Sequence, residues 1–546
     1  MMRAPAFPQF NGVHRDHTMH IDWNLPYPSR RQPVLARNAV ATSQPLAVQA
    51  GIAMLQRGGN AVDAALAAAI ALTVVEPCSN GIGSDLFAIL WDGRELVGLN
   101  ASGRAPAAVT PQRYAGLEEI PQRSWEAVTI PGAVSAWAAL SQRFGTLPFA
   151  DLFVPAIRYA RDGYAVSPVV AEKWAAAEKV LPHDLGFAEH FLPRGRAPVA
   201  GEMWSCPAMA RTLEGIAATQ GNAFYRGELA QMMVAHAHAN GALHTLSDFA
   251  EHTVDWVAPL GLDYAATTVH EIPPNGQGIA ALMALGILRA FDLKSLTPDS
   301  VASQHLQIEA MKLAFADAYR YVSDPRTMEF APSELLDPDY LASRARLIDP
   351  KCAQDFGPGD PPRGGTVYLC AADERGMIVS LIQSNYMGFG SGVVVPGTGI
   401  SLQNRGTGFS LAPGHPNEIG GGKRPFHTII PGFLTRNGAP LAAFGVMGGA
   451  IQPPGHVQTL VRLLIHGMNP QAALDAPRWK LNGGISVDLE ASAPHELRAG
   501  LIARGHQIDA VADSYMDFGA GQIILRTDGG YAAASDPRRD GQAAGF

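Results

Sequence analysis

Two long apolar stretches lie near the start of the chain, and each carries the end signals of a helix. The first helix is predicted to begin at Ser43, whose hydroxyl can cap it, and to continue through Leu55. The second is predicted over 61–75, with Asn60 as its cap and Asp63 in the capping-box position. That stretch has about fifteen residues, fewer than the roughly 20 of a membrane-spanning helix, so it predicts a buried helix.

Later segments alternate between the periods of strands and helices, which indicates an α/β organisation. Segments with strand character and turn signals at their ends are 85–91, 96–99, 367–373, 377–384, 441–446, 485–489 and 522–526. A broad apolar face over 306–321 predicts a long helix. Helices are expected mainly before residue 366 and strands mainly after it. This distribution predicts two sheets sandwiched between helix layers, an α+β fold.

The junction between these two parts of the chain carries the most informative residues. A linker rich in proline and glycine, 349–365, ends directly at Thr366, the first residue of a predicted strand. If the chain cuts itself between Gly365 and Thr366, the new N-terminus holds a hydroxyl nucleophile and an α-amine. An α-amine with a pKa of about 7.7–8.0 is well suited to act as its base. The junction therefore predicts an N-terminal-nucleophile hydrolase; the competing interpretation is a plain loop that enters a strand.

Composition restricts the partners that the protein could bind. A net charge of -8 and a pI near 6.1 argue against nucleic acid and membrane surfaces. Residues 1–35 are polar and proline-rich, without the apolar core of a secretory signal, and predict a poorly ordered N-terminal extension. Four scattered cysteines without CxxC spacing fit reduced thiols in a cytoplasmic protein: Cys78, Cys206, Cys352 and Cys370. No cofactor is expected, and no metal site either, since His236 and His238 do not share a helix face.

Short motifs along the chain resemble those of the γ-glutamyltranspeptidases, in the same order. They are Pro45-Leu46-Ala47, Gly58 to Ala65, Val75-Glu76-Pro77, Gly81-Ile82-Gly83, Ile130 to Val134, Phe389 to Gly392, Lys423-Arg424-Pro425, Gly448-Gly449 and Ser535 to Arg538. The resemblance runs from about residue 36 to the end of the chain. It implies an αββα four-layer sandwich of the N-terminal-nucleophile hydrolase type.

The same resemblance implies roles for individual residues. Thr366 falls at the catalytic threonine, so self-cleavage after Gly365 would give a large subunit, 36–365 behind its N-terminal extension, and a small subunit, 366–546. Gly448 and Gly449 fall at the glycine pair whose backbone N–H groups form the oxyanion hole. Ser384 falls at a threonine that supports the nucleophile, and its hydroxyl can make the same hydrogen bonds.

Other positions depart from the family pattern and bear on the substrate. The arginine that clamps the α-carboxylate of a γ-glutamyl group is replaced by Ser102, and Arg104 is a candidate substitute. The residues that hold the α-ammonium group are replaced by Arg405 and Gly408, and a positive charge there would repel that ammonium. Guanidinium pairs well with carboxylate, so Arg405 favours a small carboxylate substrate without an α-amine.

Three further residues are candidate substrate contacts. His427 and Thr428 fall at a serine pair that contacts the substrate carboxylate, and Tyr386 replaces an asparagine in a way that would narrow the pocket for a short acyl group. Each of them could equally have a purely structural role.

Two classes of function follow from the sequence. The first is a self-processing threonine amidohydrolase acting on a small-molecule amide, either an oxamate-type amide or a γ-glutamyl compound such as glutathione, with water or an amine as the acyl acceptor. The second is a non-catalytic binding protein on the same scaffold. Each of the two subunits has the other as its partner, and assembly into a homo-oligomer is compatible with the sequence.

Overall fold

The computed structural model describes residues 30–181, 185–356, 365–512 and 515–546. The chain divides into Met1–Arg31 and Gln32–Phe546, and the fold below is that of the second unit. Most of the predicted N-terminal extension lies outside the described residues, but its end at 34–35 belongs to strand β1. Residues 357–364 of the linker before Thr366 also lie outside them.

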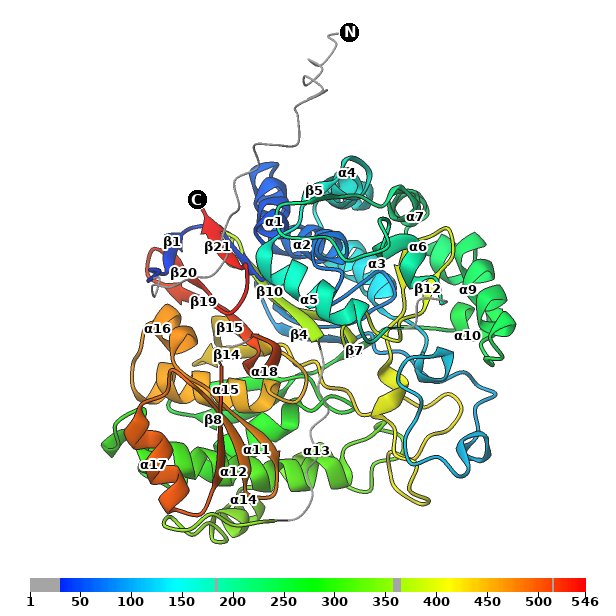
Figure 1. Cartoon of the computed structure of the whole chain (residues 1–546). Helices are drawn as coiled ribbons and strands as arrows, with labels where there is room; N and C mark the ends of the chain where they lie inside the picture. Colours follow the sequence, from blue (N-terminus) through cyan, green and yellow to red (C-terminus); the bar gives the residue numbers. More distant parts are fainter. Residues whose placement is uncertain (1–29, 182–184, 357–364, 513–514) are drawn as a thin grey trace, which may run out of the picture. The chain divides into compact units, whose positions relative to one another are not determined.

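Two seven-stranded antiparallel sheets form the centre of this unit (Figure 1). The first has the order β21 (Gln542–Gly545), β2 (Ala39–Thr42), β10 (Gly365–Ala372), β11 (Ile378–Tyr386), β3 (Asp85–Trp91), β4 (Leu96–Asn100), β7 (Asp255–Val257). The second has the order β1 (Val34–Ala36), β20 (Gly530–Ser535), β19 (Ala520–Thr527), β15 (Ala439–Met447), β14 (Gly432–Arg436), β9 (Thr267–Glu271), β8 (Leu260–Tyr264).

Three smaller sheets lie outside the central pair. They are β5 (Tyr164–Ala165) with β6 (Met203–Trp204), β12 (Val394–Val395) with β13 (Ile400–Ser401), and β16 (Trp479–Gly483) with β17 (Ser486–Glu490) and β18 (Gln507–Val511).

Helices cover the outer face of each large sheet. The helices packed in the core of the first sheet include α1 (Pro45–Gln56), α2 (Ala61–Val75), α3 (Ala133–Phe144), α4 (Val154–Asp162), α5 (Pro168–Glu178) and α7 (Pro207–Ala218). Those in the core of the second include α11 (Gly278–Leu288), α12 (Val301–Tyr321), α14 (Pro338–Ala345), α15 (Gln452–Leu460), α16 (Pro470–Asp475) and α17 (His495–Ala503). The remaining described α-helices are α6 (Phe187–Phe191), α8 (Asn222–Tyr225), α9 (Glu228–Ala239), α10 (Leu246–Ala250), α13 (Pro332–Leu335) and α18 (Tyr515–Phe518).

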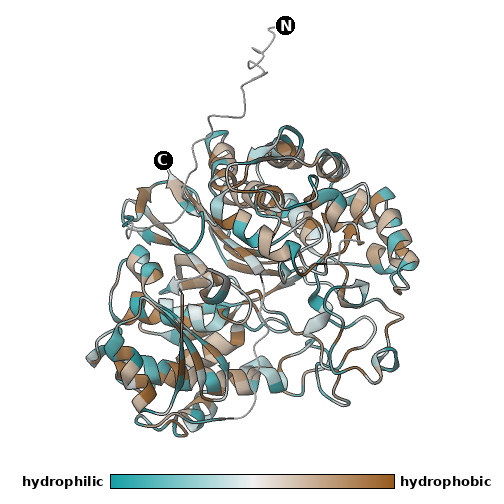
Figure 2. Ribbon diagram, in the orientation of Figure 1, coloured by the Kyte–Doolittle hydropathy of each residue, from teal (hydrophilic) through white to brown (hydrophobic). Residues whose placement is uncertain are grey.

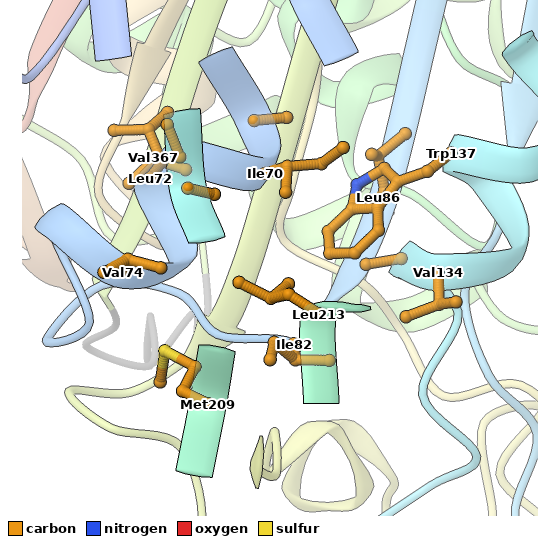
Figure 3. Packing of buried hydrophobic residues seen from close by; sticks show 14 of the residues in the cluster. Ile70, Leu72, Val74, Ile82, Leu86, Val134, Trp137, Met209, Leu213 and Val367 are labelled. Atoms are coloured by element: carbon orange, nitrogen blue, oxygen red, sulfur yellow. The ribbon is translucent and has the colours of Figure 1, made fainter. Parts of the chain in front are cut away.

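The side chains of β10 show how the four layers are held together. Val367, Leu369 and Ala371 point into the core shared with α2, where Figure 3 shows Val367 with Leu72. Tyr368 and Cys370 point the other way, into the core between the two sheets. Alternation along one strand thus fills two separate cores. Figure 2 shows the matching hydropathy, with hydrophobic strands inside and helices of mixed character outside. The predicted αββα sandwich is confirmed.

The structure confirms some predictions of local structure and contradicts another. The capping box at Asn60 and Asp63 and both predicted hairpins, β3–β4 and β10–β11, are confirmed. The cap of α1 was assigned to the wrong residue: the side chain of Gln44 accepts from the N–H of Leu46, while Ser43 donates to the buried carboxylate of Glu76 at 2.5 Å. A buried carboxylate without a hydrogen-bond partner is costly, so the Ser43 hydroxyl bonds to Glu76 and not to the helix end.

The expected distribution is confirmed for the described helices, because α1–α14 precede residue 365 and α15–α18 follow it, whereas the strands divide more evenly, with β1–β9 before and β10–β21 from residue 365 onward. Both sheets contain strands from before and after residue 365, and β10 lies between β2 and β11. Helices such as α15 and α17 follow residue 366. The two parts of the chain are therefore interwoven, and Thr366 lies on the inner strand β10.

Among the described residues, no helix combines the length and apolar character needed to cross a bilayer. All four cysteines carry free thiols, and only Cys352 is exposed. The cytoplasmic location stays a prediction.

Candidate active site

Thr366 is the second residue of β10 and is fully buried. Its hydroxyl oxygen Oγ1 lies 3.1 Å from Oγ of Ser384 on β11 and 3.5 Å from Nε2 of Gln452, the first residue of α15. Thr366, on β10, therefore contacts the neighbouring strand β11 and also α15, a helix of the layer that covers the second sheet. The β10–β11 register shifts between Gly365 and Val367, so the regular ladder is interrupted at Thr366.

Ser384 lies where the sequence predicted it to support the nucleophile. Its Oγ accepts a hydrogen bond from the backbone N–H of Tyr386 at 2.8 Å, and this bond fixes the hydroxyl beside Thr366. Tyr386 has a positive φ of 77° and pairs with Gly365 across the two strands. A non-glycine residue in this conformation is uncommon and marks a locally constrained backbone next to the candidate scissile bond.

Gly448 and Gly449 form the turn between β15 and α15. Both have positive φ, 132° and 72°. A Cβ at Gly448 would lie 2.7 Å from Cγ2 of Ile451 and 3.0 Å from Cα of Gly519, so only glycine fits. Gln452, whose side chain reaches Thr366, follows this turn, so the glycine pair stands at the N-terminal end of α15. The first backbone N–H groups of a helix have no partner within the helix and can bind an anion.

Arg405 is 1% exposed and lies on a single 3₁₀ turn, Arg405–Gly408. Its guanidinium carbon is 4.8 Å from the ring centre of Tyr386, and one terminal nitrogen donates to Oγ1 of Thr428 at 2.7 Å. Nε and Nη2 are buried without a hydrogen-bond partner. Burial lowers the pKa of Arg405 to about 10, although Asp85 acts in the opposite direction, so the side chain is a cation at neutral pH. Tyr386, Arg405 and Thr428 thus form one group.

Asp85, which the sequence analysis missed, provides negative charge near Arg405. Its Oδ1 accepts from the N–H of Gly132 at 3.0 Å, and its Oδ2 lies 3.0 Å from Nε2 of His427. Burial raises the pKa of Asp85 to about 6, although Arg405 lowers it. Burial and the nearby charges of Arg405 and Arg424 hold the pKa of His427 well below its usual range, so the ring is neutral.

The contacts of His427 favour the structural one of its two expected roles. Its Nε2–H donates to Asp85, and its Nδ1 accepts from the N–H of Ile429 at 3.3 Å. Both ring nitrogens are thus hydrogen-bonded within the protein, and His427 helps to hold the carboxylate of Asp85 in place. No sequence signal marked this pair, because the partners are 342 residues apart.

Arg104 does not join the group around Arg405. It pairs with Asp324 at 3.2 Å and approaches Asp255 at 4.0 Å, and it donates to the carbonyl of Gly422 at 3.3 Å. Ser102 is held by Asn100 and Asn275. Arg104 is thus engaged by two carboxylates, and its role as a replacement for the missing carboxylate clamp stays a prediction.

Gln277 and Gln452 are two further residues that the sequence analysis missed. Nε2 of Gln277 donates to the carbonyls of Thr428 at 2.6 Å and Gly449 at 3.0 Å, so it ties the Arg405 group to the glycine turn. The one available signal for Gln452 was its place three residues after Gly449 at a helix start.

A cavity of about 550 Å³ opens beside Tyr386. Its walls come from the 117–122 loop, from Tyr386 and Met387, and from 407–412. Tyr386 and Met387 connect this cavity to the end of β11, whereas Thr366 and Arg405 are not among its lining residues.

One buried cluster has side chains of the kind that ligate metals: His305, Glu309 and His506. Lys312 donates to Glu309 at 2.7 Å, and the two histidine rings contact each other at 2.8 Å between Nδ1 and Nε2. The carboxylate is thus neutralised by an ammonium group, and the cluster has the character of a hydrogen-bonded network.

Comparisons with known proteins agree with this architecture. The family model described as gamma-glutamyltranspeptidase matches residues 47–546. The chain is 37% identical over 516 residues to the oxamate amidohydrolase proenzyme of Klebsiella pneumoniae, covering 92% of this chain and 97% of the relative. It is 35% identical over 524 residues to the glutathione hydrolase-like YwrD proenzyme of Bacillus subtilis, covering 93% of this chain and 98% of the relative.

A solved structure extends this agreement to three dimensions. The crystal structure of cephalosporin acylase from Bacillus halodurans superposes with a TM-score of 0.93 at 48% identity, covering 97% of this chain and 99% of that one. Both the sequence and the fold of this chain therefore match those of its relatives over nearly the whole length. The protein belongs to the γ-glutamyltranspeptidase family of N-terminal-nucleophile amidohydrolases.

Proposed function

We propose that this enzyme activates itself by cleavage between Gly365 and Thr366, and that Thr366 then hydrolyses amides whose acyl part ends in a carboxylate and has no α-ammonium group. The observation that carries the substrate class is Arg405, a buried cation with two unpartnered nitrogens next to the nucleophile's support. The two subunits remain partners after cleavage because each of the two sheets contains strands from both of them.

The reaction follows from the groups around Thr366. Oγ1 attacks the carbonyl carbon of the amide while its proton passes to the α-amine of the same residue. The carbonyl oxygen becomes an oxyanion, which the N–H groups of Gly448 and Gly449 stabilise. The C–N bond breaks and the amine leaves with the proton from the α-ammonium. Water then attacks the Thr366 ester, releasing the carboxylic acid and restoring the hydroxyl.

Arg405 favours a carboxylate because its unpartnered donors are costly in a buried site. A buried polar group without a partner destabilises the protein by roughly 1–3 kcal/mol, and by more when it is charged. A ligand that accepts hydrogen bonds from Nε and Nη2 removes this penalty, and its binding is favoured by that amount. A carboxylate matches two guanidinium nitrogens in geometry and charge. An α-ammonium group near Arg405 would instead meet a like charge.

The relatives support two acyl lengths for this site. One is named as an oxamate amidohydrolase and another as a glutathione hydrolase-like protein. Ser102 is engaged by Asn100 and Asn275, and Arg405 stands in the region expected to bind the α-ammonium. These features favour the oxamate type or another simple carboxylate over a γ-glutamyl compound.

A matched pair of anilides tests the substrate class. Glutaryl 4-nitroanilide has the same carbon chain and carboxylate as the γ-glutamyl compound and lacks only the α-ammonium group. We expect kcat/KM to be about tenfold or more higher for the glutaryl compound, since like charges destabilise the other complex. Ammonia release from oxamate measures the shortest acyl group. Preference for the γ-glutamyl anilide would overturn the assignment to Arg405.

Denaturing electrophoresis tests the self-cleavage. The processed protein is expected to give two bands at roughly two thirds and one third of the full length. One full-length band after long incubation would instead support a non-catalytic binding protein.

A further inference from the structure

Gln452 is fully buried at the first position of α15, and both ends of its side-chain amide have defined neighbours. Its Oε1 accepts from the backbone N–H of Ile430 at 3.0 Å. An N–H group can bond only to the oxygen of an amide, so this contact fixes the orientation of the amide. Nε2 therefore faces Oγ1 of Thr366, at 3.5 Å.

The nucleophile oxygen thus lies between two different groups. Ser384 presents a hydroxyl that can donate or accept, and Gln452 presents a group that can only donate. An N–H donor that faces Oγ1 stabilises negative charge on this oxygen. Catalytic hydrogen bonds are often long before substrate binds and shorten in the transition state, which is consistent with 3.5 Å.

We infer that Gln452 is a catalytic residue, whose Nε2–H stabilises negative charge on Oγ1 of Thr366 during self-cleavage and turnover. This inference rests on the proposed role of Thr366 as the nucleophile.

Charge develops on Oγ1 twice in each reaction. In the first step the O–H bond breaks, the proton passes to a base, and Oγ1 forms a bond to the carbonyl carbon. In the second step water adds to that carbon, the ester C–Oγ1 bond breaks, and Oγ1 recovers a proton. The N–H group keeps its own proton throughout, so Gln452 contributes electrostatic stabilisation.

A purely structural role for Gln452 makes a different prediction. In that case its only task would be to anchor α15 through Ile430, and its loss would lower stability without a specific effect on the reaction. Gln458 provides a matched control on the same helix. It is 1% exposed, and its amide bonds to the carbonyls of Pro454 at 3.2 Å and Trp479 at 3.0 Å, with no part in the site.

The test compares Gln452→Glu, Gln452→Leu and Gln458→Leu in the full chain. Gln452→Glu is nearly isosteric, but it replaces the donor with an acceptor that repels the developing negative charge. Self-cleavage is followed by denaturing electrophoresis, stability by Tm, and turnover of the processed enzyme by kcat and KM. We expect both Gln452 variants to cleave about 10- to 100-fold more slowly, and their processed forms to lose kcat with KM unchanged. Gln458→Leu should lower Tm but retain the wild-type rates.

Wild-type cleavage rates in both Gln452 variants would overturn the inference. An equal loss of rate in Gln458→Leu would overturn it as well, because the effect would then be general to the helix. If one Gln452 variant fails to fold, the other decides. Failure of the proposed function has a separate signature: the wild-type chain stays uncut, or Thr366→Ala is cut.

Discussion

The hydroxyl oxygens of Thr366 and Ser384 lie 3.1 Å apart on two adjacent strands, both fully buried at the centre of the first sheet. The backbone N–H of Tyr386 holds the Ser384 hydroxyl in place. This contact joins the predicted nucleophile to a fixed polar group inside a rigid sheet. Reactivity at Thr366 is therefore expected to depend on the hydroxyl itself and on the groups that hold it.

Thr366→Ala is expected to remain a single full-length chain, because no hydroxyl remains to attack the carbonyl of Gly365. Thr366→Ser keeps the hydroxyl and should be cut, although more slowly, since the missing methyl leaves χ1 less restricted. Electrophoresis over several hours measures both. Cleavage of the alanine variant would refute Thr366 as the nucleophile.

Ser384→Ala is expected to slow self-cleavage and lower kcat by about tenfold or more, because it removes a partner of Oγ1 and leaves the N–H of Tyr386 without an acceptor. Ser384→Thr should retain most of the rate. Ser380→Ala is the control, since Ser380 lies on the same strand and contacts the hydroxyl of Tyr368 at 2.8 Å. Equal effects at both serines would contradict a specific role for Ser384.

Gly448→Ala is expected to reduce self-cleavage by about 100-fold, the effect of losing an oxyanion donor. The added Cβ would collide with Ile451 and Gly519 and displace the turn. Gly438→Ala is the control: that residue also has a positive φ, 76°, but has open space around it. A normal cleavage rate in Gly448→Ala would exclude this turn as the oxyanion site.

Arg405→Met is expected to raise KM for the glutaryl anilide by about 100-fold, because the carboxylate loses a charged partner. Tm should stay unchanged or rise, since methionine removes two buried, unpartnered donors. Arg462→Met is the control: Arg462 is also buried but pairs with Asp299 at 3.1 Å. An unchanged KM in Arg405→Met would place the substrate carboxylate elsewhere.

Asp85 gives a dependence of stability on pH. Its pKa is raised in the folded state, from 3.8 to about 6, so the fold favours the protonated carboxyl. The stabilisation is present below about pH 4 and is lost as the pH rises through about 6. The side chain introduced by Asp85→Asn cannot ionise, so the variant does not lose stability through this group as the pH rises. Relative to the variant, wild type should therefore lose about 2–3 kcal/mol of unfolding free energy over this range.

Chemical denaturation in the Thr366→Ala background measures this difference, because each chain then stays intact. A gap between the two proteins that is constant from pH 4 to 7 would show that Asp85 titrates at its ordinary pKa.

Short-range signals were the part of the fold that sequence could predict. Asn60 and Asp63 close a capping box within three residues, and β3 and β4 pair across a short turn. The cap of α1 failed at Ser43, because Glu76, 33 residues away, takes its hydroxyl. Sequence patterns gave no information on which strands share a sheet, because that depends on pairings such as β10 with β2, more than 300 residues apart.

The amino-acid sequence alone indicated which chemical groups are available: a threonine behind glycine at the start of a strand, a glycine pair at Gly448-Gly449, and an arginine at Arg405. Tertiary structure decided which groups converge there. Gln452 reaches Thr366 over 86 positions, and Asp85 reaches His427 over 342. It also directed Arg104 to Asp324. Hydrogen bonds and ion pairs depend on distance in space, and packing of the two sheets and their helices sets those distances.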